Sequence, residues 1–168
     1  EYLKSSPHNV RYNDINLGHR SPWLSGLAFE LGLDSHFIVT DPDVVPCEEC
    51  PSDVFEHFER ALNRYPDIDK VGFSLRIDDI PEHYKHASDV VKWESQWWLD
   101  ERYPGFFFSP IDTTFAMYRP GEGHLNHRAL RCAPPYVAQH MPWYENSALP
   151  NEELEYYLAH ADSLIINW

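Results

Sequence analysis

A short apolar run that ends in two carboxylates constrains the fold of this chain more than any other feature. Residues 36–40 read His-Phe-Ile-Val-Thr, and Asp41-Pro42-Asp43 follows directly. The run has the length and composition of a buried strand, so the two carboxylates are expected where a central strand stops, in a cleft. In open α/β sheets, ligands bind just beyond the carboxyl ends of the strands.

The Asp41 and Asp43 pair has two interpretations. Closely spaced carboxylates suit a hard divalent cation, which prefers oxygen ligands and often keeps phosphate as a further ligand. This interpretation predicts a metal-assisted site for a phosphate-bearing substrate. Asp-Pro-Asp is also favourable turn chemistry, so the spacing alone leaves a surface turn open.

Composition excludes several classes of protein. The chain has 168 residues, of which 43% are hydrophobic, enough for one domain with a core and too apolar for a disordered chain. The net charge of −14 argues against a protein that binds nucleic acid through its phosphates. It does not argue against a small phosphate ligand, because a bound cation reverses the local charge. No apolar run reaches the length of a transmembrane segment, and no signal-peptide pattern is visible.

The chain has three cysteines. Cys47 and Cys50 form a Cys-Glu-Glu-Cys pair, and Cys132 stands alone. This low, odd count is typical of a reducing compartment and predicts a cytoplasmic protein. The pair is either half of a zinc site or two incidental thiols, and no second pair follows at zinc-finger spacing.

The remaining periodicity alternates helices with strands and predicts an α/β chain. Ser21-Pro22 begins a helix that Gly32 ends, and Ser52 begins another that Pro66 ends. The other expected elements are strands at 70–77 and 113–119, a helix at 81–98, an irregular aromatic loop at 103–110, loops with one short helix at 120–150, and a last helix from Asn151.

Several blocks of residues, in a fixed order, extend over nearly the whole chain. They are Asn16-Leu17-Gly18-His19 with Trp23, residues 39–43, residues 71–79 (Val-Gly-Phe-Ser-Leu-Arg-Ile-Asp-Asp), Trp93-Glu94, residues 111–119 (Ile-Asp-Thr-Thr-Phe-Ala-Met-Tyr-Arg), Ala129-Leu130-Arg131, Pro135-Tyr136 and residues 140–144 (His-Met-Pro-Trp-Tyr). In this order they resemble the nucleotide-sugar glycosyltransferases of the GT-A fold, most closely a bacterial group related to glycosyltransferase family 2.

The resemblance implies a Rossmann-like GT-A fold, with a mainly parallel central sheet flanked by helices, in a single partial domain over 1–168. It implies a nucleoside-diphosphate sugar donor and an acceptor, expected to be a glycan. Asp41 and Asp43 occupy the Asp-x-Asp motif that holds Mn²⁺ or Mg²⁺ against the diphosphate. Members of the family begin with a strand and helix that precede residue 1 here, so we expect an exposed sheet edge that either leads to self-association or leaves an open half-site with few nucleotide contacts.

Three further residues are candidates for the chemistry. His140 is a third metal ligand by resemblance, or a histidine packed among aromatic side chains. Asp112 is a candidate general base for the acceptor hydroxyl, or the cap of a turn. Glu94 competes for the same role, or only pairs with a base such as Lys92 or Arg102.

Substrate contacts are expected from two further groups. Arg76, Asp78 and Asp79 follow the strand at 70–77 and are placed to contact sugar hydroxyls, although Asp-Asp before a helix is also an N-terminal cap. His19 and Trp23 are expected to line the nucleotide, although Trp23 fits a packing role equally well.

Two other questions stay open from the sequence. Trp93, Trp97 and Trp98 form either a stacking wall for an acceptor sugar or part of the core. The alternative functions are a non-catalytic remnant that binds a nucleotide or a partner, and a metal-dependent nucleotidyl-transfer or phosphohydrolase enzyme that uses the same carboxylates.

Overall fold

The structure, a computed structural model, describes residues 2–15, 17–112, 114–124 and 127–149, together with 152, 155, 156 and 159. Its helices are α1 (Ser21–Leu24), α2 (Leu27–Gly32), α3 (Val54–Arg64) and α4 (Ala87–Glu94), with four short 3-10 helices, η1 (Tyr2–Ser5), η2 (Gly18–Arg20), η3 (Ser95–Trp98) and η4 (Met141–Tyr144). Its strands are β1 (Phe37–Val39), β2 (Val44–Pro46), β3 (Lys70–Leu75), β4 (Phe106–Phe108), β5 (Ala116–Tyr118) and β6 (Ala129–His140).

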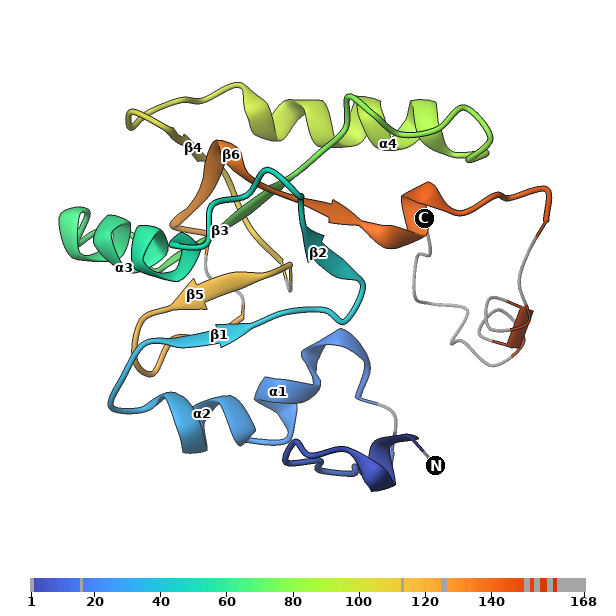
Figure 1. The fold of residues 1–168 in the computed structure, drawn as a ribbon. Helices are drawn as coiled ribbons and strands as arrows, with labels where there is room; N and C mark the ends of the chain where they lie inside the picture. The colour runs from blue at the N-terminus through green and yellow to red at the C-terminus, as the bar shows by residue number, and fades with distance from the viewer. Residues whose placement is uncertain are drawn as a thin grey trace.

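The six strands form one mixed sheet flanked by helices, so the chain is α/β (Figure 1). The order is β1-β5-β3-β6-β2, and β4 also pairs with β6. Only the β3–β6 pairing is parallel among the described strands, and the pairs β1–β5, β3–β5, β2–β6 and β4–β6 are antiparallel. The expectation of a mainly parallel sheet was therefore wrong, because a resemblance in residue order does not fix strand direction.

Alternation along the strands separates two apolar clusters. Val71 and Phe73 of β3 pack with Phe58 and Leu62 of α3 on one face of the sheet. Residues of the opposite parity, such as Tyr118 of β5, pack with α1 and α2 on the other face. The polar residue Lys70 lies on this second face, because it pairs with Tyr118 in the ladder.

The predicted helix at 21–32 is present in two pieces. Gly26 adopts a left-handed backbone, with φ of 80°, and separates α1 from α2. Gly32 is the last residue of α2, as expected, and a glycine is needed there because a Cβ atom would collide with the ring of Phe37. The predicted helix at 81–98 is also shorter, because it reduces to α4 followed by η3. Asn151, where a last helix was predicted, lies outside the described residues.

The loops predicted at 103–110 and 120–150 were wrong in part, because they contain β4 and the whole of β6. Pro134 and Pro135 argued against a strand, since proline donates no hydrogen bond to a ladder. The structure accommodates them in a bulge, because the β3 partner shifts from Cys132 to Val137 across one residue step. The short helix expected in 120–150 is η4.

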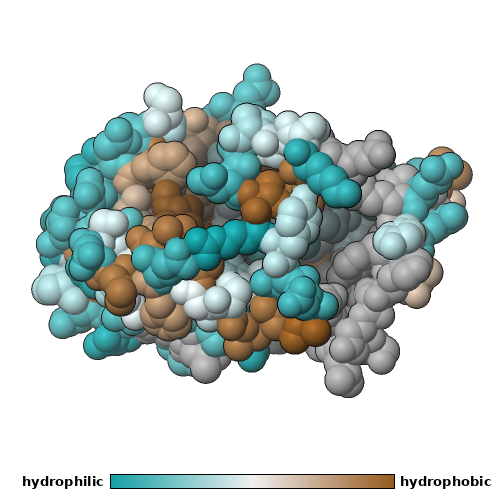
Figure 2. Space-filling view, turned by 90° about the horizontal axis from the view of Figure 1, so that it is seen from below, coloured by the Kyte–Doolittle hydropathy of each residue, from teal (hydrophilic) through white to brown (hydrophobic). Residues whose placement is uncertain are grey.

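Strand β1 lies at one end of the sheet, so the expectation of a central strand before Asp41 was also wrong. In the described part of the chain, β1 pairs only with β5. Apolar side chains are exposed nearby, including Leu24, Leu31, Leu33 and Ile38. Figure 2, seen from the side of α1 and α2, shows apolar patches interrupted by polar side chains. None of the described helices is long and apolar enough to cross a membrane.

Candidate functional site

The ends of four strands bring the predicted metal and sugar-contact residues toward one edge of the sheet. Asp41 and Asp43 follow β1, and Arg76 follows β3. Because β5 runs antiparallel to both β1 and β3, its first residue lies at the same edge as their carboxyl ends. Strand β6 runs parallel to β3 and ends there with His140. The topology thus gathers residues that are about 100 positions apart in the sequence.

The turn after β1 is attached to the end of β6. The backbone N–H of Met141 donates to the carbonyl of Asp43 at 2.8 Å. Nε2 of His140 lies 3.4 Å from Oδ2 of Asp43, and this contact lowers the pKa of the Asp43 carboxyl. The imidazole also packs against the ring of Trp143 at 4.8 Å between centroids. The packing interpretation of His140 is therefore confirmed for Trp143, and the imidazole also faces Asp43, a predicted metal ligand.

Two polar atoms of this pair have no hydrogen-bond partner among the described residues. They are Oδ1 of Asp43 and Nδ1 of His140, and both are buried. Leaving buried polar atoms unpaired costs free energy, and such atoms commonly serve a ligand, an ion or water. The two residues face each other through Oδ2 of Asp43 and Nε2 of His140, and carboxylate oxygens and imidazole nitrogens are donors that Mn²⁺ accepts. The residues present therefore fit a divalent cation.

Asp41 is half-buried on the same turn. Burial raises the pKa of Tyr118 most, and the charges of Asp112 and Asp41 raise it further, so all three side chains share one region of the sheet. No group of three His, Cys, Asp or Glu side chains placed to hold a metal occurs in the described residues. The structure thus joins Asp43 with His140, and it leaves Asp41 outside that pair.

Asp112 is an exposed residue whose carboxyl group is partly buried and held in a fixed orientation. Its Oδ1 accepts hydrogen bonds from the backbone N–H of Thr114 at 3.0 Å and from its hydroxyl at 2.6 Å. Burial opposes ionisation of Asp112, but these bonds and the Arg131 and Lys70 cations outweigh it and lower the pKa of the carboxyl. Asp112 does form a turn, as the alternative proposed, and its carboxylate is also ionised and accessible.

Glu94 is placed differently. Its Oε2 accepts a hydrogen bond from Nη1 of Arg131 at 2.8 Å, and both side chains are buried. Burial raises the pKa of Glu94, against the opposing effect of Arg131. The arginine is further fixed by a bond from its Nε to the carbonyl of Pro110 at 3.0 Å. A buried, ion-paired carboxylate has no access to an acceptor hydroxyl, so the pairing alternative describes Glu94 better, although the partner is Arg131 and not Lys92 or Arg102 as expected.

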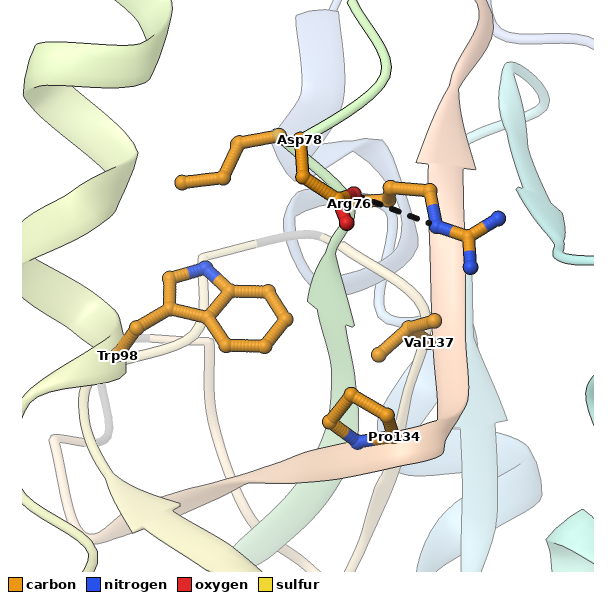
Figure 3. Close-up of a pocket in the computed structure, with 6 residues that line it drawn as sticks. Arg76, Asp78, Trp98, Pro134 and Val137 are labelled. Carbon is orange, nitrogen blue, oxygen red and sulfur yellow. Dashed lines mark ion pairs between the residues drawn. The ribbon is translucent and has the colours of Figure 1, made fainter.

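A pocket of about 300 Å³ lies where β3 ends (Figure 3). It is lined by Arg76, Ile77, Asp78, Trp98, Pro134 and Val137. Nε of Arg76 lies 3.6 Å from Oδ1 of Asp78, and its Nη1 lies 3.8 Å from Oδ2 of Asp79. Asp79 also accepts the hydroxyl of Tyr144 at 2.5 Å, which ties this strand end to η4. Two of the three predicted sugar-contact residues therefore line a pocket.

His19 and Trp23, which were predicted to line the nucleotide, lie on the face of the sheet opposite to α3. Trp23 is buried in the second apolar cluster, 5.4 Å from the ring of Tyr118 and 5.5 Å from that of His124, as its packing alternative expects. His19 is exposed in η2, close enough to His124 to help lower the pKa of that imidazole, which burial lowers most.

Sequence reasoning gave no role to two buried cations. Lys70 is fully buried, and its Nζ donates to the carbonyls of Asp112 and His124 at 3.3 Å each. Arg131 is the partner of Glu94. Each occurs in or beside an apolar run, and a charge in such a run requires buried partners, which is the signal that would have identified them. All three cysteines are free thiols, and Cys47 and Cys132 are buried.

No protein-family model, curated protein or solved structure significantly matches this chain.

Proposed function

We propose that this chain is a glycosyltransferase domain of the GT-A fold that transfers a sugar from a nucleoside-diphosphate donor to an acceptor hydroxyl. The observation that carries the proposal is the Asp43–His140 pair, with one unpartnered buried polar atom on each residue, on the turn that also holds Asp41. The nature of the substrate is inferred from the ordered blocks of residues that resemble these enzymes. The α/β sheet is compatible with this class of enzyme.

Asp43 and His140 would hold Mn²⁺ or Mg²⁺, with Asp41 beside them. When bound, the cation neutralises negative charge on the donor diphosphate as it leaves. An imidazole that ligates a metal must be neutral, so the cation competes with a proton for His140. The Asp43 carboxylate is already ionised at neutral pH, because its pKa is lowered.

Asp112 would act as the general base. Acceptance of the hydroxyl proton requires an ionised carboxylate within hydrogen-bond reach. Asp112 is ionised at neutral pH, because its pKa is lowered, and it is exposed as the role requires, while Thr114 holds its orientation. Lys70 supports the segment by binding its main-chain carbonyl from the interior.

The test is calorimetric titration of the chain with UDP- and GDP-sugars, with and without Mn²⁺, followed by measurement of released nucleoside diphosphate. Asp43→Ala and Asp41→Ala should each abolish metal-dependent binding with little loss of stability. Asp34→Ala is the matched control, because Asp34 is exposed at the opposite end of β1. Unchanged metal and nucleotide affinity in both site variants would contradict the proposal.

The products of the same titration separate the alternatives. Transfer requires both donor and acceptor to be consumed. Binding without turnover would identify a non-catalytic remnant. Donor consumption that is independent of any acceptor would identify a phosphohydrolase.

A further inference from the structure

The pocket at the end of β3 has one aromatic wall and one aliphatic wall. Trp98 projects from η3 across the pocket toward Val137 and Pro134 of β6 (Figure 3). The indole is braced from behind by the ring of Phe107, 5.4 Å away between centroids. The volume of about 300 Å³ is at the small end of the range for ligand sites, so the pocket suits one ring-sized group.

The open end of the pocket is polar. The ion pair between Arg76 and Asp78 lies at this end (Figure 3). Nε of Arg76 is 3.6 Å from Oδ1 of Asp78, which is longer than a charge-assisted hydrogen bond. The Asp78 side chain is 85% exposed, so its oxygens are available to a ligand. A guanidinium donates hydrogen bonds and a carboxylate accepts them, whereas a hydroxyl does both. A ring that carries several hydroxyls can therefore use both residues at once.

The charge at this end disfavours an anionic ligand such as a phosphate. Arg76 is the cation here, and it faces Glu49, Asp78 and Asp79 at 3.4 to 3.8 Å. One positive charge against three negative charges leaves the rim acidic, so it repels a nucleotide. The pocket thus differs from the candidate donor site, and a neutral ligand fits it better than an anion.

The rim of the pocket is joined to the segment that carries His140. The backbone N–H of Arg76 donates to the carbonyl of Ala138 at 2.8 Å, and the Gln139 side chain donates to Asp79 at 3.3 Å. A group bound in the pocket is therefore only a few residues along β6 from the Asp43–His140 pair. This proximity is what an acceptor site beside a donor site requires.

We infer that this pocket binds a neutral pyranose ring of the glycosyl acceptor, with its apolar face on Trp98 and its hydroxyls on Asp78 and Arg76. The role as an acceptor site rests on the proposed function, whereas the binding of a sugar ring does not. An aromatic wall with a few polar groups at one end is the usual construction of a small-molecule site, and it suits a ring with one apolar face.

The test is an NMR titration of the chain with a panel of methyl glycosides, without metal or nucleotide. The indole N–H signal of Trp98 is assigned by its loss in Trp98→Phe. At least one glycoside should shift this signal saturably in the millimolar range, whereas the signal of Trp93, which is exposed on α4, should not move. Asp78→Ala should weaken the affinity about tenfold, the effect of losing a hydrogen bond to a charged group.

Asp89→Ala is the matched control, because Asp89 is an exposed carboxylate on α4 outside the pocket, and it should leave the affinity unchanged. The inference is overturned if no glycoside shifts Trp98, if Asp78→Ala binds as tightly as the wild type, or if uridine monophosphate shifts Trp98 more effectively than any glycoside. Loss of glycoside binding with intact Mn²⁺-dependent donor binding would overturn the pocket alone. The reverse result would overturn the proposed function and leave the sugar site supported.

Discussion

Replacing Glu94 by glutamine should destabilise the chain far more than its conservative shape suggests. Glu94 and Arg131 are paired at 2.8 Å with side-chain exposures of only 8% and 5%. Removing one partner of a buried ion pair leaves an uncompensated buried charge and costs about 3–5 kcal/mol. Glutamine can still accept the Arg131 hydrogen bond through its amide oxygen. We therefore expect a loss of about 3 kcal/mol, a large part of the roughly 5–15 kcal/mol of a typical domain.

Urea denaturation of the wild type, Glu94→Gln, Arg131→Met and the double variant measures this effect. Each single change should lower the free energy of unfolding, and the double change should cost clearly less than their sum, because the second change removes the charge that the first left unpaired. Asp100→Asn is the matched control. Asp100 forms a 2.6 Å pair with Arg102, but both side chains are half exposed, so the loss should be at most about 1 kcal/mol.

The same variant distinguishes the two candidate bases. Under conditions where it is folded, Glu94→Gln should keep most of any transferase activity, whereas Asp112→Asn should lose about 10²–10⁴-fold with little change in stability. Additive stability losses in the cycle would show that the ion pair does not form as described. A fully stable but inactive Glu94→Gln would assign the base role to Glu94 and refute our reasoning.

Two further predictions concern the buried Lys70 and the exposed edge of β1. The interior lowers the pKa of Lys70 from 10.5 to about 8, so the folded chain releases this proton before the unfolded chain does. The free energy of unfolding should therefore rise as pH increases through about 8 and fall as pH decreases. Between about pH 7 and about pH 9, the wild type should gain about 1 kcal/mol relative to Lys70→Met, as measured by urea denaturation. Equal pH dependence in the two proteins would refute this. The wild type should also self-associate through the edge of β1, and Ile38→Lys should prevent it; a wild type that sediments as a monomer at all concentrations would contradict that.

Helices and strands were predicted best from the sequence where the apolar pattern agreed with the residues that start or end an element, such as proline. Helix α3 and strand β3 were expected almost in full, because Phe58 and Ala61 repeat with helical spacing and Val71 and Phe73 alternate. Strand β6 was missed because Pro134 signals a loop, and only the register shift against β3 shows how a strand passes that position. Its place in the sheet depends on tertiary pairing, which no local pattern carries.

The candidate site was predictable as a list of residues and not as an arrangement. Asp41 and Asp43 were visible from the end of the apolar run. The proximity of His140 to Asp43 depends on the β2–β6 pairing, in which Val44 lies opposite His140. The different roles of Glu94 and Asp112 depend on burial, because both are carboxylates beside apolar residues and only the structure shows which one is paired with an arginine.

The distribution of charge explains why a cation would be needed for the proposed reaction. The chain carries a net charge of −14, and Asp41, Asp43 and Asp112 lie toward one region of the sheet. The buried cations nearby are already engaged, Arg131 with Glu94 and Lys70 with two carbonyl oxygens. A diphosphate brought to this region would meet like charge unless a divalent ion came with it. Donor binding should therefore depend on the metal, and its dependence on salt should be weak once the metal is bound.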